Sequence, residues 1–181
     1  FIINSGTLNS NVAGALASST SANATTVTVN SGGELRGTVA GAFKSGGTGT
    51  PSQAITLSGG TVRLANAATT DFGGNLNYTS GNLILDRTAS GAAATHTMGS
   101  LSIGSVTLQP TTANFTSTPT LAFGSTSITG NATLDASNVI FTLSSLDAGA
   151  NTSLTTAGSN TVNLTGFTQL SGNFAISANG T

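Results

Sequence analysis

Short runs in which every second residue is apolar recur along this chain. The clearest run, ITLSGGTVRL at residues 55–64, places Ile55 and Leu57 before a Ser-Gly-Gly and a second apolar pair after it. Because side chains alternate between the two faces of a strand, the members of each pair share one face. The run therefore predicts two short strands, each with one apolar face, joined at the Ser-Gly-Gly.

The Ser58-Gly59-Gly60 junction has two structural interpretations. Glycine adopts positive φ at little steric cost, so the junction can close a β-hairpin. It can equally form a corner, at which the chain bends and a second strand faces the same core. Comparable apolar pairs recur at spacings of roughly 18 to 28 residues, within the range of solenoid repeats, at Val27/Val29, Ile55/Leu57, Leu76/Tyr78, Leu101/Ile103, Leu121/Phe123, Val139/Phe141 and Val162/Leu164.

Each repeat reads as strand, corner, strand and a looser polar stretch, such as residues 65–74 and 87–99. One such unit cannot bury its apolar face alone, whereas stacked units bury a continuous interior. The chain is therefore predicted to be all-β, a single parallel β-helix (solenoid) segment over residues 1–181, and the corner is favoured over the hairpin. An antiparallel β-sandwich is the alternative, because it uses the same short strands and turns. The predicted inward-facing residues are Leu57, Leu64, Leu85, Ile103 and Phe123.

The composition is polar but almost uncharged. Charged residues make up 5% of the 181, against about a quarter in ordinary globular proteins. This suits stacked turns, because like charges in adjacent turns repel. Four Lys and Arg residues form no basic patch, so nucleic acid is not an expected partner. No apolar run is long enough to cross a bilayer, and with no Cys there are no disulfides or cysteine–zinc sites.

Three stretches carry a family resemblance: LSGGTVRLANAATT, SGNLILDRTAS and HTMGSLSIGSVTLQP. They resemble the autotransporter-associated β-strand repeat of very large bacterial surface proteins, at Gly-Gly-Thr-Val 59–62, Leu-Asp-Arg 85–87 and Met-Gly-Ser-Leu 98–101. The resemblance covers roughly residues 55–110 and departs after Pro110, where TTANFTSTPT has no Gly-Gly-Thr strand. It implies a right-handed β-helix that is secreted and displayed outside the cell, with no catalytic residues.

Few side chains offer chemistry. His96 is the only histidine and lies in a polar stretch, so it is expected to be solvated rather than catalytic. Asp71 and Asp147 are expected to stabilise turns rather than bind calcium, which needs six to eight oxygen ligands. Asp86 is expected to be neutralised by the following Arg87 or to cap a corner. No spacing forces two carboxylates together as glycoside cleavage requires, so the chain is predicted to be no enzyme and to need no cofactor.

Both ends of the sequence read as apolar strands without a cap. Terminal coils of a solenoid carry unpaired N–H and C=O groups, which natural solenoids cover with capping elements. The sequence therefore predicts a structural extracellular or cell-surface protein, a subunit or segment of a filament, stalk or adhesin. It would join end to end with copies of itself or with adjoining coils of a longer parent chain. A carbohydrate-binding or carbohydrate-active β-helix protein is the alternative. The predicted assembly residues are Phe1, Ile2, Ile3, Phe174 and Ile176.

Overall fold

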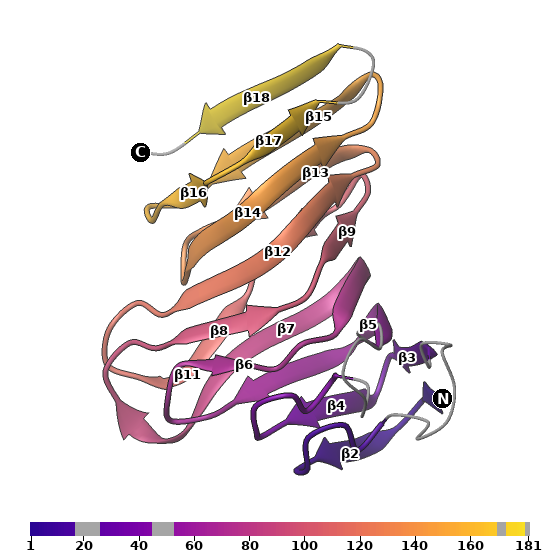
Figure 1. Ribbon diagram of the computed structural model, residues 1–181, viewed down its shortest axis with the longest axis vertical. Helices are drawn as coiled ribbons and strands as arrows, with labels where there is room; N and C mark the ends of the chain where they lie inside the picture. The colour runs from indigo at the N-terminus through magenta and orange to yellow at the C-terminus, as the bar shows by residue number, and fades with distance from the viewer. Residues whose placement is uncertain (17–25, 45–52, 170–172, 180–181) are drawn as a thin grey trace.

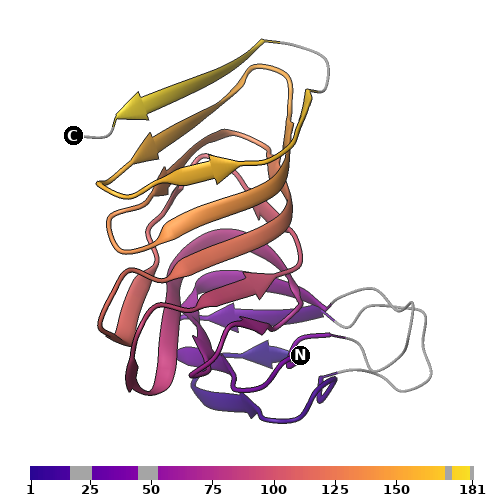
Figure 2. The same ribbon diagram turned by 60° about the vertical axis from the view of Figure 1, so that its left-hand side comes forward.

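The computed structural model describes residues 1–16, 26–44, 53–169 and 173–179, and its regular elements there are strands β1 to β18. The strands stack from the N-terminal to the C-terminal end in one column (Figures 1 and 2). Every strand pairing in these ranges is parallel. The predicted parallel solenoid is therefore confirmed. The antiparallel β-sandwich alternative is wrong, because a sandwich needs antiparallel neighbours.

The first wall of the solenoid is an unbroken parallel ladder. Equivalent residues follow one another in register, and a turn takes 28 residues from Thr28 to Thr56 but only 20 from Ser127 to Asp147. The wall is formed in order by β1 (Ile2–Ile3), β3 (Thr26–Asn30), the start of β5 (Ala54–Ala65), the start of β7 (Asn75–Gly91), β9 (Leu101–Ile103), the end of β12 (Thr120–Ile128), the end of β14 (Ile140–Ala148) and β17 (Phe167–Gln169).

The second wall consists of two ladders that meet at Pro110. The N-terminal ladder contains β2 (Gly6–Ser10), β4 (Gly33–Gly37), the middle parts of β5 and β7, and β11 (Thr111–Phe115). The C-terminal ladder contains β10 (Thr107–Leu108), β13 (Asn131–Asp135), β15 (Thr152–Ala157) and β18 (Phe174–Asn179). Only Gln109 and Pro110 separate β10 from β11, and proline has no N–H to donate to a ladder. The solenoid continues past Pro110, although the repeat motif stops there.

The third wall comes from segments that include the predicted loose polar stretches. It consists of β6 (Thr70–Asp71), β8 (Thr95–Met98), the starts of β12 and β14, and β16 (Val162–Leu164). Residues 65–74 and 87–99, predicted as looser polar stretches, therefore contain strands of their own, which the prediction does not include. The inward positions of β8 hold His96 and Met98, and a histidine does not register as apolar in an alternation pattern.

The third wall also corrects the predicted repeat. The sequence predicts that the pairs beginning at Leu101 and Leu121 are equivalent in successive turns. That equivalence is wrong, because Thr126 lies in register with Leu101, whereas Leu121 lies in register with His96. Leu101 belongs to the first wall and Leu121 to the third. The polar side chain of Thr126 at an inward position weakens the apolar pattern of the first wall in this turn.

The Ser-Gly-Gly at residues 58–60 is a corner, as predicted. β5 continues through it, and both halves of β5 pair in parallel with β7. Gly59 has a φ of 87°, which glycine adopts without steric cost. A Cβ on Gly60 would lie 2.4 Å from the carbonyl oxygen of Asn30 in the preceding turn. Glycine therefore lets the corners of successive turns stack in direct contact.

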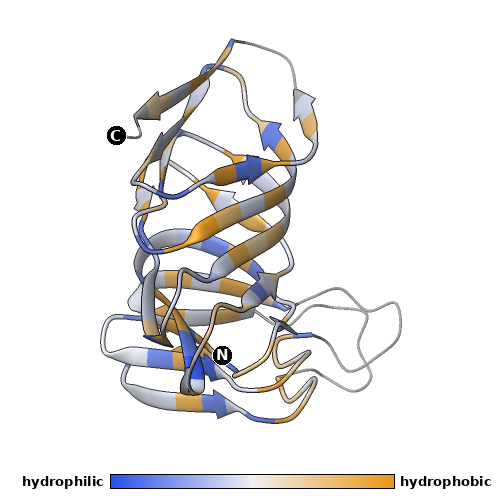
Figure 3. Cartoon of the chain, turned by 90° about the vertical axis from the view of Figure 1, so that its left-hand side faces the viewer, coloured by the Kyte–Doolittle hydropathy of each residue, from blue (hydrophilic) through white to orange (hydrophobic). Residues whose placement is uncertain are grey.

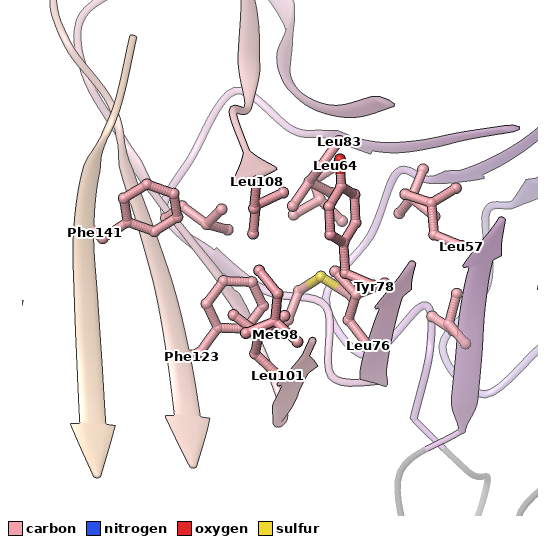
Figure 4. Close-up of a cluster of buried hydrophobic side chains, with 14 of the residues drawn as sticks. Leu57, Leu64, Leu76, Tyr78, Leu83, Met98, Leu101, Leu108, Phe123 and Phe141 are labelled. Atoms are coloured by element: carbon pink, nitrogen blue, oxygen red, sulfur yellow. The ribbon is translucent and has the colours of Figure 1, made fainter. Parts of the chain in front are cut away.

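The interior is filled by side chains from all three walls (Figure 4). Hydrophobic and hydrophilic residues alternate along many of the strands (Figure 3), and buried positions alternate with more exposed ones in the same strands. The largest fully buried side chains are those of Phe43, Phe72, Phe123 and Phe141. The predicted inward-facing residues are confirmed, since all are at most 1% exposed: Leu57, Leu64, Leu85, Ile103 and Phe123.

Candidate functional site

The N-terminal end of the solenoid leaves apolar side chains uncovered. Phe1 and Ile2 are 68% and 69% exposed, and Leu8 is also exposed. Leu8 lies in register with the buried Leu35 of the next turn, so it occupies a core position, and no described strand lies on its other side. A hollow of about 420 Å³ opens at this end between β1 and β2 and is lined by residues 1–5, Thr7 and Leu8. The first turn therefore ends in an open slice of core.

The C-terminal end is open in the same way. Phe167 is 48% exposed and Ile176 is 55% exposed. These two residues and Leu164, which is also exposed, lie in register with residues that the next turn inward buries, at Leu146, Leu154 and Leu143. The rings of Phe167 and Phe174 stack on each other, with centroids 5.9 Å apart and an interplanar angle of 29°. The first and second walls thus contact each other across the top of the column.

The backbone edges of the terminal strands are also free on one side. Among the described residues, β1 pairs only with β3 and β2 only with β4. At the other end, β18 pairs only with β15, and both β16 and β17 pair only with β14. Each end therefore presents a row of peptide groups in the geometry that a further parallel strand would need.

The five predicted assembly residues are divided between the two ends. Phe1 and Ile2 lie exposed at the N-terminal end, whereas Ile3 points inward and is buried. Phe174 is half-buried against the core, and Ile176 is exposed. The sequence analysis missed four further exposed apolar residues of the terminal turns: Leu8, Val12, Leu164 and Phe167. A search of the terminal segments for every alternating apolar residue would have found Leu8 and Leu164.

Three charged side chains, those of Glu34, Arg63 and Asp86, form a cluster on the outer face of the second wall. Arg63 donates from Nε to Glu34 at 3.2 Å and from Nη1 to Asp86 at 2.9 Å. Burial acts to lower the pKa of Arg63, but the hydrogen bonds to Glu34 and Asp86 outweigh it and raise the pKa. Because the guanidinium already donates to two carboxylates, it is not available for bidentate binding of an anionic substrate. The cluster therefore stabilises the wall.

Asp86 is neutralised by a different arginine from the one predicted. Its carboxylate binds the guanidinium of Arg63 and accepts from Asn114 Nδ2 at 2.8 Å and from the backbone N–H of Arg87 at 2.7 Å. The Arg87 guanidinium turns away and donates to the carbonyls of Ala89 and Ala92. The predicted Asp86–Arg87 charge pair is therefore wrong, because adjacent strand residues point to opposite faces. The alternative prediction is that Asp86 caps the backbone locally, and Asp86 does so by accepting a hydrogen bond from the Arg87 N–H.

Two of the other aspartates, Asp71 and Asp135, stabilise local turns. Asp71 accepts from the N–H of Gly73 at 2.9 Å and pairs with Lys44 at 2.6 Å. Asp135 accepts from the N–H of Ser137 at 2.9 Å, and both are the two-residue bonds of an Asx turn. Asp147 instead lies within β14, in register with Ser127 and Thr168, so its predicted role in a turn is wrong. Within the described ranges, no three side chains of the metal-ligating types come together.

His96 is not solvated, contrary to the prediction. It is fully buried on β8, between the rings of Phe72 and Phe115. Its Nε2 lies 3.2 Å from the carbonyl oxygen of Asn66. The polar neighbours of His96 in the sequence point outward, which is why the sequence alone places the residue in a polar loop.

Fold and surface together define the described part of this chain as a parallel β-solenoid with exposed apolar side chains in its first and last turns. Comparison with family models, with curated proteins and with solved structures finds no match for it. The described part of the chain contains no helix that could span a bilayer.

Proposed function

We propose that this chain is a structural segment of an extracellular or cell-surface β-solenoid, working in a filament, stalk or adhesin that is built by joining coils end to end. One observation carries the proposal. Among the described residues, every large apolar side chain that is exposed lies in the first or the last turn: Phe1, Ile2, Leu8, Val12, Leu164, Phe167 and Ile176. Ile2 lies in register with Thr28 on the outward face of the first wall. Four of the others lie in register with buried residues of the neighbouring turn: Leu8, Leu164, Phe167 and Ile176.

The two ends have different strand edges, and these edges are complementary in their hydrogen-bonding groups. A parallel ladder has a different edge at its first and last strand, so one end can continue the other. Such a contact is heterologous, and it produces an open filament when the rotation does not close. The low charge of the chain, a formal net charge of −1, leaves little repulsion to oppose stacking.

The cover over each end is either a second copy of this chain or an adjoining coil of a longer parent chain. Both would use the same contacts, with a parallel strand added to β1 and β2 or to β17 and β18. Each added coil would bury apolar surface that now faces water, which stabilises by about 25 cal/mol per Å². The proposed role is therefore to supply length and shape rather than chemistry.

The surface location is supported by the resemblance to the autotransporter-associated β-strand repeat and by the absence of cysteine from the chain. The proposal that the chain is not an enzyme is supported by the use of Glu34, Asp71, Asp86 and Asp135 in local hydrogen bonds and ion pairs.

Light scattering and electron microscopy of the purified chain test the assembly. The wild type is expected to form end-to-end oligomers that grow with concentration. Ile176→Lys should abolish growth, because it places a charge on the open core. Thr133→Lys, on the outer face of the adjacent part of the second wall, is the matched control and should still assemble. A dispersed monomer at high concentration, or equal loss in both variants, contradicts the proposal.

Carbohydrate binding is the second candidate function, and a hollow in the side of the column favours it. The hollow has a volume of about 260 Å³ and is lined by hydroxyl side chains, Asn138 and one aromatic ring, that of Phe115. Hydroxyl groups beside an aromatic surface suit a neutral sugar. A glycan array tests this candidate, with Thr118→Lys to fill the hollow and Thr133→Lys as control. Binding that is equal in both variants, or absent from the wild type, excludes this hollow.

A further inference from the structure

The His96 side chain lies in an enclosed aromatic environment. The centroid of its ring is 5.2 Å from that of Phe72 and 5.7 Å from that of Phe115, and both contacts are edge-to-face. Since the Asn66 carbonyl oxygen near Nε2 can only accept, Nε2 carries the proton of the neutral ring. Nδ1 is buried and makes no hydrogen bond of good geometry, although the Leu64 carbonyl acts to favour the charged ring. A second proton on this ring would therefore arrive at an atom without a well-placed acceptor.

Phe115 belongs to a small cover that closes over His96, formed by Arg87, Asn114 and Phe115. The guanidinium carbon of Arg87 lies 5.8 Å from the centroid of the Phe115 ring, a cation–π contact. Asn114 adopts a φ of 61°, and its Nδ2 donates to Asp86 and to the carbonyl oxygen of Arg87. The cover thus rests on a few contacts at the end of β7 and on β11, the last strand of the N-terminal ladder of the second wall.

Among the described residues, two charged groups act on the imidazole, and both come from β7. Arg87 opposes a positive charge on His96, and Asp86 favours one. Asp86 already binds Arg63, Asn114 and the Arg87 N–H. On β6, Asp71 points to solvent and pairs with Lys44, while β11 and β12 carry no ionisable side chain.

We propose that His96 is an acid-sensitive latch: when the ring gains a second proton, the imidazolium leaves its aromatic site, the cover of Arg87, Asn114 and Phe115 lifts, and the turn around β8 and β11 opens. The closed form favours the neutral imidazole, and the open form favours the imidazolium. This inference concerns the side of the column and does not rest on the proposed assembly at its ends.

The direction of the pH effect follows from proton linkage. Burial lowers the pKa of His96 below its ordinary value of 6.5, and Arg87 acts in the same direction. The Asn66 and Leu64 carbonyls and the Asp86 carboxylate offset only part of this effect. The open form therefore binds a proton more readily than the closed form. The closed form keeps its full stability above pH 6.5 and loses stability as the pH falls below that value. The equilibrium constant for opening then rises by up to about tenfold per pH unit.

Native-state hydrogen exchange of the intact chain, corrected for the intrinsic pH dependence of amide exchange, measures this opening between about pH 7.5 and pH 5. Amides of residues 95–98 and 111–115 are expected to exchange from an open state whose population rises by up to about tenfold per unit below pH 6.5. Amides of β13 and β15 serve as an internal reference and should not change.

His96→Leu is the matched variant, because Leu121 occupies the register position next to His96 in the following turn. It should fold and should lose the pH dependence of residues 95–98 and 111–115. NMR titration of the imidazole in the wild type gives a second readout that needs no variant, since His96 is the only histidine. Undiminished pH dependence in His96→Leu, or a ring that titrates at its ordinary value with no change in exchange, would overturn the latch.

Discussion

Ile176 lies directly beyond Leu154 in register on the second wall, yet Leu154 is 2% exposed and Ile176 is 55% exposed. The two side chains have the same chemical character and point to the same side of the ladder. The difference is that the turn containing β18 covers Leu154, whereas no described strand lies on the other side of Ile176. The position of a residue along the column therefore decides how much its side chain contributes to stability.

This relationship predicts a contrast between two alanine variants. Leu154→Ala removes buried methyl groups and should lower the free energy of unfolding by about 2–5 kcal/mol. Ile176→Ala, at the open end, should change it by no more than about 0.5 kcal/mol in a dispersed chain. Urea denaturation at low protein concentration measures both, and equal losses would contradict the assignment of the open end.

An acidic substitution tests the assignment of faces on β5. Leu57→Asp buries an unpaired carboxylate in the core and should prevent cooperative folding or lower the melting temperature severely. Thr56→Asp, one residue earlier on the outer face, should change stability by about 0.5 kcal/mol or less. Thermal unfolding followed by circular dichroism compares them. If Leu57→Asp melts like the wild type, the assigned face is wrong.

The corner at residues 58–60 predicts that replacing Gly60 lowers the stability of the fold. A Cβ on Gly60 would meet the Asn30 carbonyl oxygen at 2.4 Å and the Val29 Cγ1 at 2.7 Å, so Gly60→Ala should cost about 1–3 kcal/mol through overpacking. At Gly104 a Cβ would meet only Thr129 Oγ1, at 3.6 Å. Gly104→Ala should therefore be neutral or should stabilise by about 0.4–1 kcal/mol. Chemical denaturation ranks the two variants, and similar effects would exclude the corner stack as the reason for Gly60.

Two buried threonines should respond to valine with opposite signs. Thr126 Oγ1 is buried with no hydrogen-bond partner, so Thr126→Val should raise stability by about 1 kcal/mol. Thr152 Oγ1 donates to the Gly149 carbonyl oxygen at 2.7 Å, so Thr152→Val should lower stability by about 1 kcal/mol. The midpoints of denaturant unfolding measure both effects. If both substitutions lower stability, Thr126 Oγ1 must make a hydrogen bond.

The sequence by itself determined the inward faces of the strands with an apolar alternation, and the glycine corner. Alternation over a few residues fixes which face of a strand is apolar, and it correctly placed Leu57, Leu85 and Phe123 in the core. Glycines at residues 59–60 indicated a bend, because backbone conformation is a local property. Apolar terminal runs likewise identified the two ends as sites of exposed core, although Ile3 proved to be buried.

Only the tertiary structure decided which strands stack on which. Leu121 continues the third wall rather than the position of Leu101, His96 is buried, and Asp86 pairs with Arg63 rather than with Arg87. Alternation is periodic within a strand, whereas stacking joins residues about one turn apart, and here a turn varies from 20 to 28 residues. The lengths of the connecting segments set that register, and the partners of a side chain follow from the register because each turn packs directly on its neighbours.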